Sequence, residues 1–308
     1  MTVPSHSTRT DATFTNSTLI SASELAEALR QPNPPKLLDA TYFLPPDDQN
    51  REDAYHHTHL PGALFFDIDA IADHSSALPH MLPDATSFAE AMTRLGIENG
   101  DWLVIYDRNH NAGACRAWWM LKSYGHVWVS VLDGGLTAWQ QAGLPVEHTP
   151  VTPTVSNPPY LATLQPDWVK DLPTMLANLE TAGFRILDAR SAQRFEGEAP
   201  EPRPGLQSGH IPGSQNLPWQ SLICAESHQF LPEATLRERL SAVAPDRAQP
   251  LVTSCGSGLT ACLLAFTLDR LGYASVAVYD GSWAEWGCEP NRPIETGPAK
   301  ASFATAPA

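Results

Sequence analysis

Residues 251–261 read Leu-Val-Thr-Ser-Cys-Gly-Ser-Gly-Leu-Thr-Ala, and this stretch is the most informative part of the chain. Its apolar, β-branched start predicts a buried strand that ends at Ser254. The residues from Ala261 to Leu271 are apolar at the spacing of a helix. The chain therefore passes from a strand through a short turn directly into a helix, and Cys255 opens that turn.

This position predicts a reactive thiol. The first N–H groups of a helix have no partner within the helix, and the helix dipole favours negative charge there. Gly256 and Gly258 permit a close approach of the backbone and a positive φ. Such surroundings favour the thiolate, which is the nucleophilic form of cysteine. The alternative, a small buried core residue, is common for cysteine in general but does not account for this placement.

Phosphatases use a similar turn to hold phosphate oxygens, so phosphate ester hydrolysis is a second alternative. That chemistry needs an arginine that closes a Cys-x5-Arg turn and grips the phosphate with both guanidinium nitrogens. Position 261 is alanine, and the next arginine is Arg270. The sequence therefore argues against a phosphatase.

Length and composition set limits on the architecture and on the partners. The 308 residues favour two domains, and 43% hydrophobic residues are enough for two cores. The formal net charge of −15, without a run of Lys or Arg, disfavours binding to nucleic acid or to an anionic membrane. We find no apolar run long enough to span a membrane, and residues 1–17 are polar, unlike a secretory signal.

Cysteine usage indicates a reducing compartment, and we expect a cytoplasmic protein. The 5 cysteines form no Cys-x-x-Cys pair, which disfavours a disulfide framework and a metal site. Cys262 lies in the helical run and is expected in the core, whereas the sequence gives no role for Cys288.

The chain contains an internal duplication, with offsets of 147 to 151 residues between matching segments. Four segments recur in the same order: Leu38-Asp39-Ala40 as Leu187-Asp188-Ala189, His59-Leu60-Pro61-Gly62-Ala63 as His210-Ile211-Pro212-Gly213-Ser214, Leu103–Tyr106 before Asp107 as Leu251–Ser254 before Cys255, and Asp133-Gly134-Gly135 as Asp280-Gly281-Ser282. Short apolar strands alternate with helical stretches at 22–30, 86–95, 114–124, 233–243 and 261–271. This alternation predicts two tandem α/β domains, each a mainly parallel sheet flanked by helices.

The duplication also sets the expected boundaries. We expect a flexible leader at 1–17, a first domain at 18–146, a linker at 147–166, a second domain at 167–295 and a flexible tail at 296–308. Asp107 occupies the place of Cys255, and a carboxylate cannot act as a thiol nucleophile. Only the second domain should be catalytic, and the first should supply the other wall of a cleft between them.

At this point the residues match a family. Tyr55-x3-His59-Leu-Pro-Gly-Ala63 and Val276-x2-Tyr279-Asp-Gly-Ser-Trp283-x-Glu285-Trp286 resemble the two signatures of the two-domain rhodanese-type sulfurtransferases. The loop Cys255-Gly256-Ser257-Gly258-Leu259-Thr260 is similar to the 3-mercaptopyruvate form, Cys-Gly-Ser/Thr-Gly-Val-Thr. Thiosulfate enzymes typically carry Cys-Arg-Lys-Gly-Val-Thr instead. Leu259 is the single departure from the first pattern.

The resemblance implies a 3-mercaptopyruvate sulfurtransferase without a cofactor, in which Cys255 carries sulfur as a persulfide. It implies that amides of residues 256–260 stabilise the anion, and that Arg194 and Arg203 grip the α-keto carboxylate of the donor. For each arginine, an ion pair with a nearby glutamate is the alternative. The implied sulfur acceptor is a thiol, such as thioredoxin or a small thiol, or cyanide.

The resemblance also implies a proton relay of Ser257 with two residues of the first domain, Asp69 and His80. The alternative for His80 is a loop histidine with local hydrogen bonds. We expect structural roles for His59, His210 and Arg190, and core packing for the tryptophans. Arg116 matches a family arginine near the cleft, without an assigned role.

Two other functions remain open at this stage. Thiosulfate as the preferred donor is disfavoured by Ser257, because its second negative charge is better met by a lysine at this position. A non-catalytic rhodanese-like module that binds proteins is disfavoured by the intact loop after Ser254.

Overall fold

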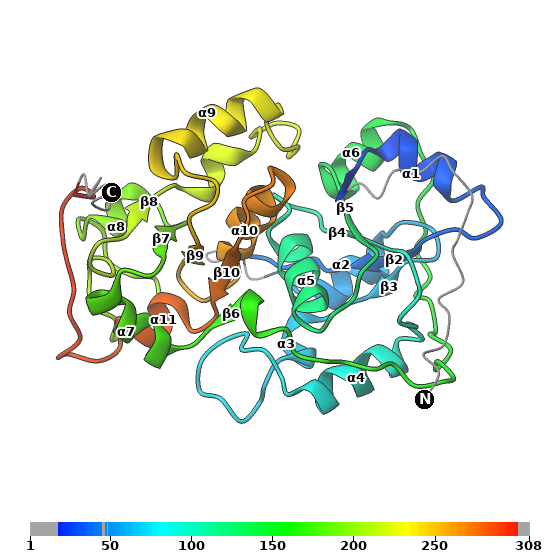
Figure 1. The fold of residues 1–308 in the computed structure, drawn as a ribbon. Helices are drawn as coiled ribbons and strands as arrows, with labels where there is room; N and C mark the ends of the chain where they lie inside the picture. The colour runs from blue at the N-terminus through cyan, green and yellow to red at the C-terminus, as the bar shows by residue number, and fades with distance from the viewer. Residues whose placement is uncertain (1–17, 45–46, 48, 301–308) are drawn as a thin grey trace.

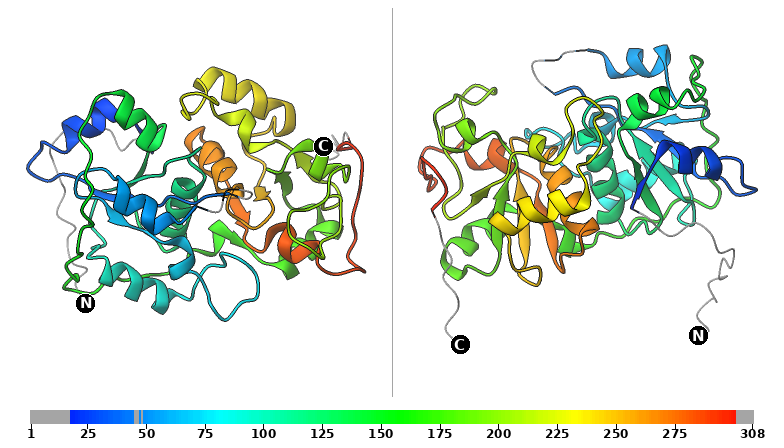
Figure 2. Two further views of the ribbon diagram at one scale, coloured as in Figure 1. Left: turned by 180° about the vertical axis from the view of Figure 1, so that it is seen from behind. Right: turned by 90° about the horizontal axis from the view of Figure 1, so that it is seen from above.

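The structure is a computed structural model, and it describes residues 18–44, 47 and 49–300. The expected leader at 1–17 lies outside these residues, as does the end of the expected tail. Within the described residues the chain forms two sheets, one in each half, and every paired strand is parallel to its neighbour. The two halves lie side by side, as Figures 1 and 2 show. The predicted pair of α/β domains is confirmed.

The first sheet has the strand order β1-β5-β4-β2-β3. Its elements are β1 (Leu19–Ile20), α1 (Ala22–Ala28), β2 (Lys36–Asp39), α2 (Arg51–His57), β3 (Leu64–Phe65), α3 (Ile68–Ile71), α4 (Ala85–Arg94), β4 (Leu103–Tyr106), α5 (Ala112–Ser123), β5 (Val129–Leu132) and α6 (Gly135–Gln141). Strand β4 lies in the middle of the sheet, and every one of its residues is buried. Asp107 therefore stands at the carboxyl end of the central strand.

The second sheet repeats this order as β6-β10-β9-β7-β8. Its elements are the 3-10 helix η1 (Pro166–Trp168), β6 (Val169–Lys170), α7 (Leu172–Thr181), β7 (Arg185–Asp188), α8 (Ala192–Phe195), β8 (Gln215–Asn216), the 3-10 helix η2 (Trp219–Leu222), α9 (Glu233–Val243), β9 (Leu251–Ser254), α10 (Ala261–Arg270), β10 (Val276–Tyr279) and α11 (Ser282–Trp286). Cys255 follows the central strand β9, as Asp107 follows β4. In open parallel sheets, ligands bind at this carboxyl edge.

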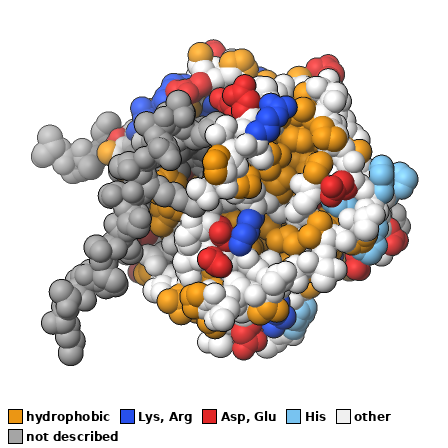
Figure 3. Space-filling model, turned by 90° about the vertical axis from the view of Figure 1, so that its right-hand side faces the viewer, with side chains coloured by type: hydrophobic (Ala, Val, Ile, Leu, Met, Phe, Trp, Pro, Cys, Tyr) orange, Lys and Arg blue, Asp and Glu red, His pale blue; other side chains and the backbone are white. Residues whose placement is uncertain are grey.

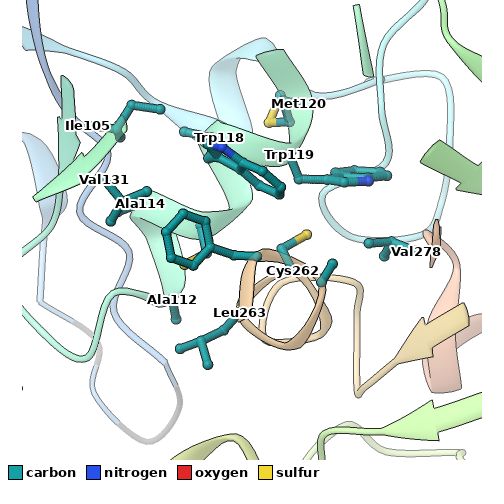
Figure 4. Packing of buried hydrophobic residues seen from close by; sticks show 14 of the residues in the cluster. Ile105, Ala112, Ala114, Trp118, Trp119, Met120, Val131, Cys262, Leu263 and Val278 are labelled. Carbon is teal, nitrogen blue, oxygen red and sulfur yellow. The ribbon is translucent and has the colours of Figure 1, made fainter. Parts of the chain in front are cut away.

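Helices α5 and α10, which follow the two central strands, pack against each other between the domains (Figures 1 and 4). Both are buried almost all round, because each faces its own sheet on one side and the other domain on the other. Trp118 of α5 meets Phe266 of α10 edge to face, with ring centroids 5.1 Å apart. One hydrophobic cluster therefore runs through both domains.

The five helical stretches expected from the sequence correspond to α1, α4, α5, α9 and α10, with ends that differ by a few residues. The tryptophans at 118, 119, 139, 283 and 286 are all at most 2% exposed, which confirms their predicted place in the core. Within the described residues, no helix combines the length and the apolar character that crossing a membrane demands. On the face drawn in Figure 3, basic side chains are scattered among acidic and hydrophobic ones.

Candidate active site

The segment that follows β10 holds the Cys255 loop in place through hydrogen bonds. The Cys255 N–H donates to Ser282 Oγ (3.2 Å), and the carbonyls of Cys255 and Gly256 accept from the N–H groups of Trp283 and Ala284. Within the described part of the chain, none of the N–H groups of residues 256–261 donates a hydrogen bond. The loop therefore presents a row of unused donors at the start of α10, where they can stabilise an anion beside the sulfur.

The other loop residues serve this geometry. Gly258 has a φ of +81°, and a Cβ there would lie 2.6 Å from the Asp280 carbonyl oxygen, so glycine is required. The Leu259 side chain is 1% exposed and belongs to the hydrophobic cluster, so the loop contributes its backbone rather than this side chain. Thr260 is 8% exposed and immediately precedes α10.

Cys255 is more covered than the sequence suggested. The sequence predicted a cleft between the domains at this cysteine, but the residue is only 2% exposed. The Arg194 guanidinium lies next to the following residue, since a Cβ on Gly256 would lie 2.9 Å from its Nη2 atom. The cysteine is thus almost closed off from solvent in this conformation.

Arg194 lies over the loop, and it is also held by a carboxylate. Its Nη2 atom is 2.5 Å from Oε2 of Glu201, whose side chain is 1% exposed. This ion pair is the alternative that the sequence left open. Because the Arg194 side chain remains 26% exposed, the pair orients the guanidinium without enclosing it, and its role as a donor-binding residue stays a prediction.

The first domain brings two of the three predicted relay residues together. His80 Nδ1 lies 2.5 Å from Asp69 Oδ1, and Arg51 lies 2.9 Å from the other Asp69 oxygen. Burial raises the pKa of Asp69, but the hydrogen bond and charge of His80 and the charge of Arg51 outweigh it and hold the pKa below its ordinary value. The Asp69–His80 pair is therefore an ionised carboxylate that orients an imidazole.

The third predicted member, Ser257, is not joined to this pair. The other nitrogen of His80, Nε2, lies 3.3 Å from the hydroxyl of Tyr42, and no hydrogen bond links His80 to Ser257 in the described residues. Ser257 is 9% exposed within the loop. Its part in the relay stays a prediction.

Arg116 ties the His80 segment to the Cys255 loop. This arginine of α5 is 0% exposed, and its Nη1 atom donates to Asp280 Oδ1 (2.6 Å) and to the Gly258 carbonyl (3.3 Å). Its Nη2 atom donates to the His80 carbonyl. Burial alone would lower the pKa of Arg116, but the charge of Asp280 outweighs it, so the guanidinium stays charged. One buried cation thus fixes the position of His80 relative to the loop.

In the first domain, the side chain of Asp107 occupies the corresponding loop. The Asp107 carboxylate accepts from the N–H groups of Asn109, Asn111, Gly113 and Ala114 at 2.9–3.3 Å. Complete burial raises the pKa of Asp107 to about 7, against the effect of those donors. In the first domain the loop amides are thus already occupied by the Asp107 carboxylate, whereas those after Cys255 are unused.

Contacts between the two domains also repeat with the duplication. The Leu82 N–H donates to Asp280 Oδ2 at 2.8 Å, and the Phe230 N–H donates to Asp133 Oδ1 at 2.8 Å. His80 and His228 precede these donors by two residues and have similar φ angles of 61° and 58°. A cavity of about 350 Å³ lies between the domains, with His110 and Trp219 but not Cys255 among its lining residues.

Three of the expected structural residues have the roles predicted for them. His59 Nδ1 and His210 Nδ1 lie 2.8 Å from the carbonyls of Tyr55 and Phe195. The Nη2 atom of Arg190 lies 2.7 Å from Asp188 Oδ2, and its Nη1 atom lies 2.8 Å from Glu201 Oε1. Cys262 is buried in the core, where burial raises its pKa to about 12.

Sequence reasoning missed Tyr42, Arg51 and Asp280 as parts of this site. Tyr42 follows β2 at the carboxyl edge of the sheet, which was the available signal for it. The match of His80-x-Leu82 with His228-x-Phe230 has the same offset as the duplication, and it could have shown that these loops are equivalent. The Arg116–Asp280 pair carried no sequence signal, because the two residues are in different domains.

Two domains with parallel sheets, one of them with a cysteine loop of unused amides after its central strand, define a class of tandem-domain proteins suited to cysteine chemistry. Comparison with known proteins identifies the family. The model of the rhodanese-like domain matches residues 21–142 and 171–288. The chain belongs to the rhodanese family.

Relatives match over nearly the full length. A Rattus norvegicus 3-mercaptopyruvate sulfurtransferase is 40% identical, over 92% of this chain and 96% of its own. An Arabidopsis thaliana relative named thiosulfate/3-mercaptopyruvate sulfurtransferase 1, mitochondrial, is 39% identical, over 93% of this chain and 80% of its own. The solved structure of Escherichia coli SseA, described as a 3-mercaptopyruvate sulfotransferase, has a TM-score of 0.78 at 36% identity, and covers 87% of this chain and 99% of that one.

Proposed function

We propose that this protein is a 3-mercaptopyruvate sulfurtransferase in which Cys255 carries the sulfur. The observation that supports this most directly is the loop after β9, where the unused N–H groups of residues 256–261 follow the cysteine up to the start of α10. The relatives named for this activity match along both domains. A loop of this kind stabilises the anionic thiolate and persulfide better than the neutral forms.

The first half of the reaction is a transfer of sulfur to the thiolate. The Cys255 thiolate attacks the sulfur of 3-mercaptopyruvate, a sulfur–sulfur bond forms, and the sulfur–carbon bond breaks with its electron pair left on carbon. The products are a persulfide on Cys255 and the enolate of pyruvate. The proton lost from the donor thiol is returned to carbon, which converts the enolate into pyruvate. No external oxidant or reductant is needed.

The surrounding residues take three tasks in this step. Arg194 and Arg203 bind the carboxylate and carbonyl of the donor. The Asp69–His80 pair accepts the thiol proton and returns it to carbon, with Ser257 as the proposed contact between His80 and the reacting atoms. Arg116 holds the His80 segment and the Cys255 loop in a fixed relation through the hydrogen bonds described above.

In the second half, a thiol or cyanide removes the outer sulfur and restores the thiolate. We propose a small thiol or thioredoxin as the acceptor and the cytoplasm as the compartment. The cysteines of the described residues are all unpaired, which agrees with a reducing environment. The name of one relative, from Arabidopsis thaliana, gives a mitochondrial location for that protein.

The nucleophile is tested by intact mass after incubation with 3-mercaptopyruvate. The expected result is a gain of one sulfur atom by the wild type and none by Cys255→Ser, with Cys288→Ser as the matched control because Cys288 is an exposed thiol outside the loop. Absence of an adduct in the wild type would indicate a protein-binding module instead.

Thiosulfate is the second candidate donor, and the name of the Arabidopsis relative includes it. The loop has no lysine to meet the second negative charge of thiosulfate, since position 257 is serine. Comparison of kcat/KM for the two donors should show a preference for 3-mercaptopyruvate in the wild type. Ser257→Lys should move the ratio towards thiosulfate. A wild type that prefers thiosulfate would overturn this choice of donor.

A further inference from the structure

Tyr42 lies beside the Asp69–His80 pair, and the proposed mechanism has not used it. It follows β2, and its hydroxyl lies 3.3 Å from His80 Nε2. The two rings meet edge to face at an interplanar angle of 80°, and the Arg51 guanidinium lies 4.7 Å from the centre of the tyrosine ring. Contacts from two sides therefore fix the ring, and the hydroxyl is held beside the imidazole.

A charge of the second domain, that of Arg203, also acts on this hydroxyl. Burial and the negative charge of Asp69 raise the pKa of Tyr42 to about 12, although the charges of Arg51 and Arg203 oppose the rise. Arg203 belongs to the second domain and is one of the two arginines assigned to the donor. Tyr42 therefore stays protonated near neutral pH, and its hydroxyl is available as a hydrogen-bond donor between a proton-carrying histidine and a substrate-binding cation.

We propose that the Tyr42 hydroxyl donates a hydrogen bond to the keto oxygen of 3-mercaptopyruvate and stabilises the oxyanion that develops there. The proposal rests on the function proposed above. As the sulfur–carbon bond breaks, its electron pair delocalises from carbon onto the keto oxygen and gives the enolate. The Tyr42 proton is shared with that oxygen and is not transferred. His80, on the same hydroxyl, then supplies the proton that the carbon takes up.

This contact is stronger in the transition state than in the bound donor. A neutral carbonyl accepts a weaker hydrogen bond than an oxyanion does, so the benefit grows as the negative charge develops. The hydroxyl is already held by its contact with His80, so little reorganisation is needed when the charge appears. Its loss should lower kcat far more than it raises KM.

The test is Tyr42→Phe, which removes one oxygen and keeps the ring on His80 and Arg51. For pyruvate formation from 3-mercaptopyruvate, kcat should fall by about 10- to 100-fold, with KM changed by less than about threefold. Discharge of the persulfide by cyanide forms no enolate. Protein loaded by long incubation with 3-mercaptopyruvate, and then freed of donor, should therefore release thiocyanate at the wild-type rate.

Tyr55→Phe is the matched control. The Tyr55 hydroxyl donates to the Ala63 carbonyl at 2.7 Å inside the first domain, so its loss should affect stability and leave both half-reactions unchanged. A wild-type kcat in Tyr42→Phe would overturn the proposal, and so would equal slowing of both half-reactions, which indicates a structural role. If the wild type itself forms no persulfide, the proposed function fails, and that result is distinct from either of these.

Discussion

Replacement of Arg116 by methionine should lower the free energy of unfolding by about 3 kcal/mol. Removal of one partner of a buried ion pair typically costs about 3–5 kcal/mol, because the other charge is left buried without compensation. Asp280 is 3% exposed, but it keeps the hydrogen bond from the Leu82 N–H at 2.8 Å, which places the cost at the lower end. Methionine retains most of the packing on Trp119, whose ring lies 4.5 Å from the guanidinium.

Thermal unfolding followed by circular dichroism measures this effect. Unfolding entropies of about 2 cal/mol/K per residue predict that a loss of about 3 kcal/mol lowers Tm by about 5 °C if both domains unfold together. Arg94→Met is the matched control. Arg94 pairs with Glu90 at 3.6 Å, but these side chains are 67% and 66% exposed, so the expected shift is below about 1 °C.

The double variant Arg116→Met/Asp280→Asn separates the ion pair from other contributions. Asparagine is neutral, so it should recover part of the stability that Arg116→Met loses, and the two effects should not add. A shift for Arg116→Met as small as that of the control would refute the reasoning, as would strict additivity in the double variant. Either result would mean that the guanidinium does not tie the two domains together.

Three further predictions concern the loops and the relay. Gly258→Ala should destabilise the protein by about 1–3 kcal/mol more than Gly62→Ala in urea unfolding, because both glycines have positive φ but only the first has a neighbour within 4 Å of an added Cβ. The lowered pKa of Asp69 means that its contribution to stability is present above pH ~4 and is lost as the pH falls through the lowered pKa. The Tm difference between wild type and Asp69→Asn should therefore shrink in acid, and a constant difference contradicts this. Asp107→Cys in a Cys255→Ser background should form no pyruvate, since the first domain has no arginines at the matching positions, and turnover would show that the loop alone suffices.

The sequence could predict those parts of the site whose residues lie close together along the chain. The Cys255 loop, the matching Asp107 loop and the duplication are all recognised from local spacing. The structure places the two loops at equivalent edges of the two sheets. The Asp69–His80 contact came from the family resemblance. The Arg116–Asp280 pair could not be predicted, because a buried cation is identified only by its partners from another domain. The burial of Cys255 also escaped prediction, since the exposure of a loop residue depends on packing by segments distant in the sequence.

Under the proposed function, the duplication gives the first domain a part in catalysis. Asn111, in the loop after β4, donates to the His228 carbonyl, and Arg116 joins the His80 carbonyl to Gly258 in the loop after β9. The loop after the central strand of each half is thus linked to a histidine segment of the other half, and neither domain alone contains Cys255 and His80 together. Asp107 stands at the position of the nucleophile in the first domain, where its carboxylate accepts from the loop amides itself. The first domain then contributes His80, Tyr42 and Arg116 to the site of Cys255. Separation of the domains should therefore abolish the first half-reaction even if each folds, because the Asp69–His80 pair would leave with the first domain while Cys255 remained with the second.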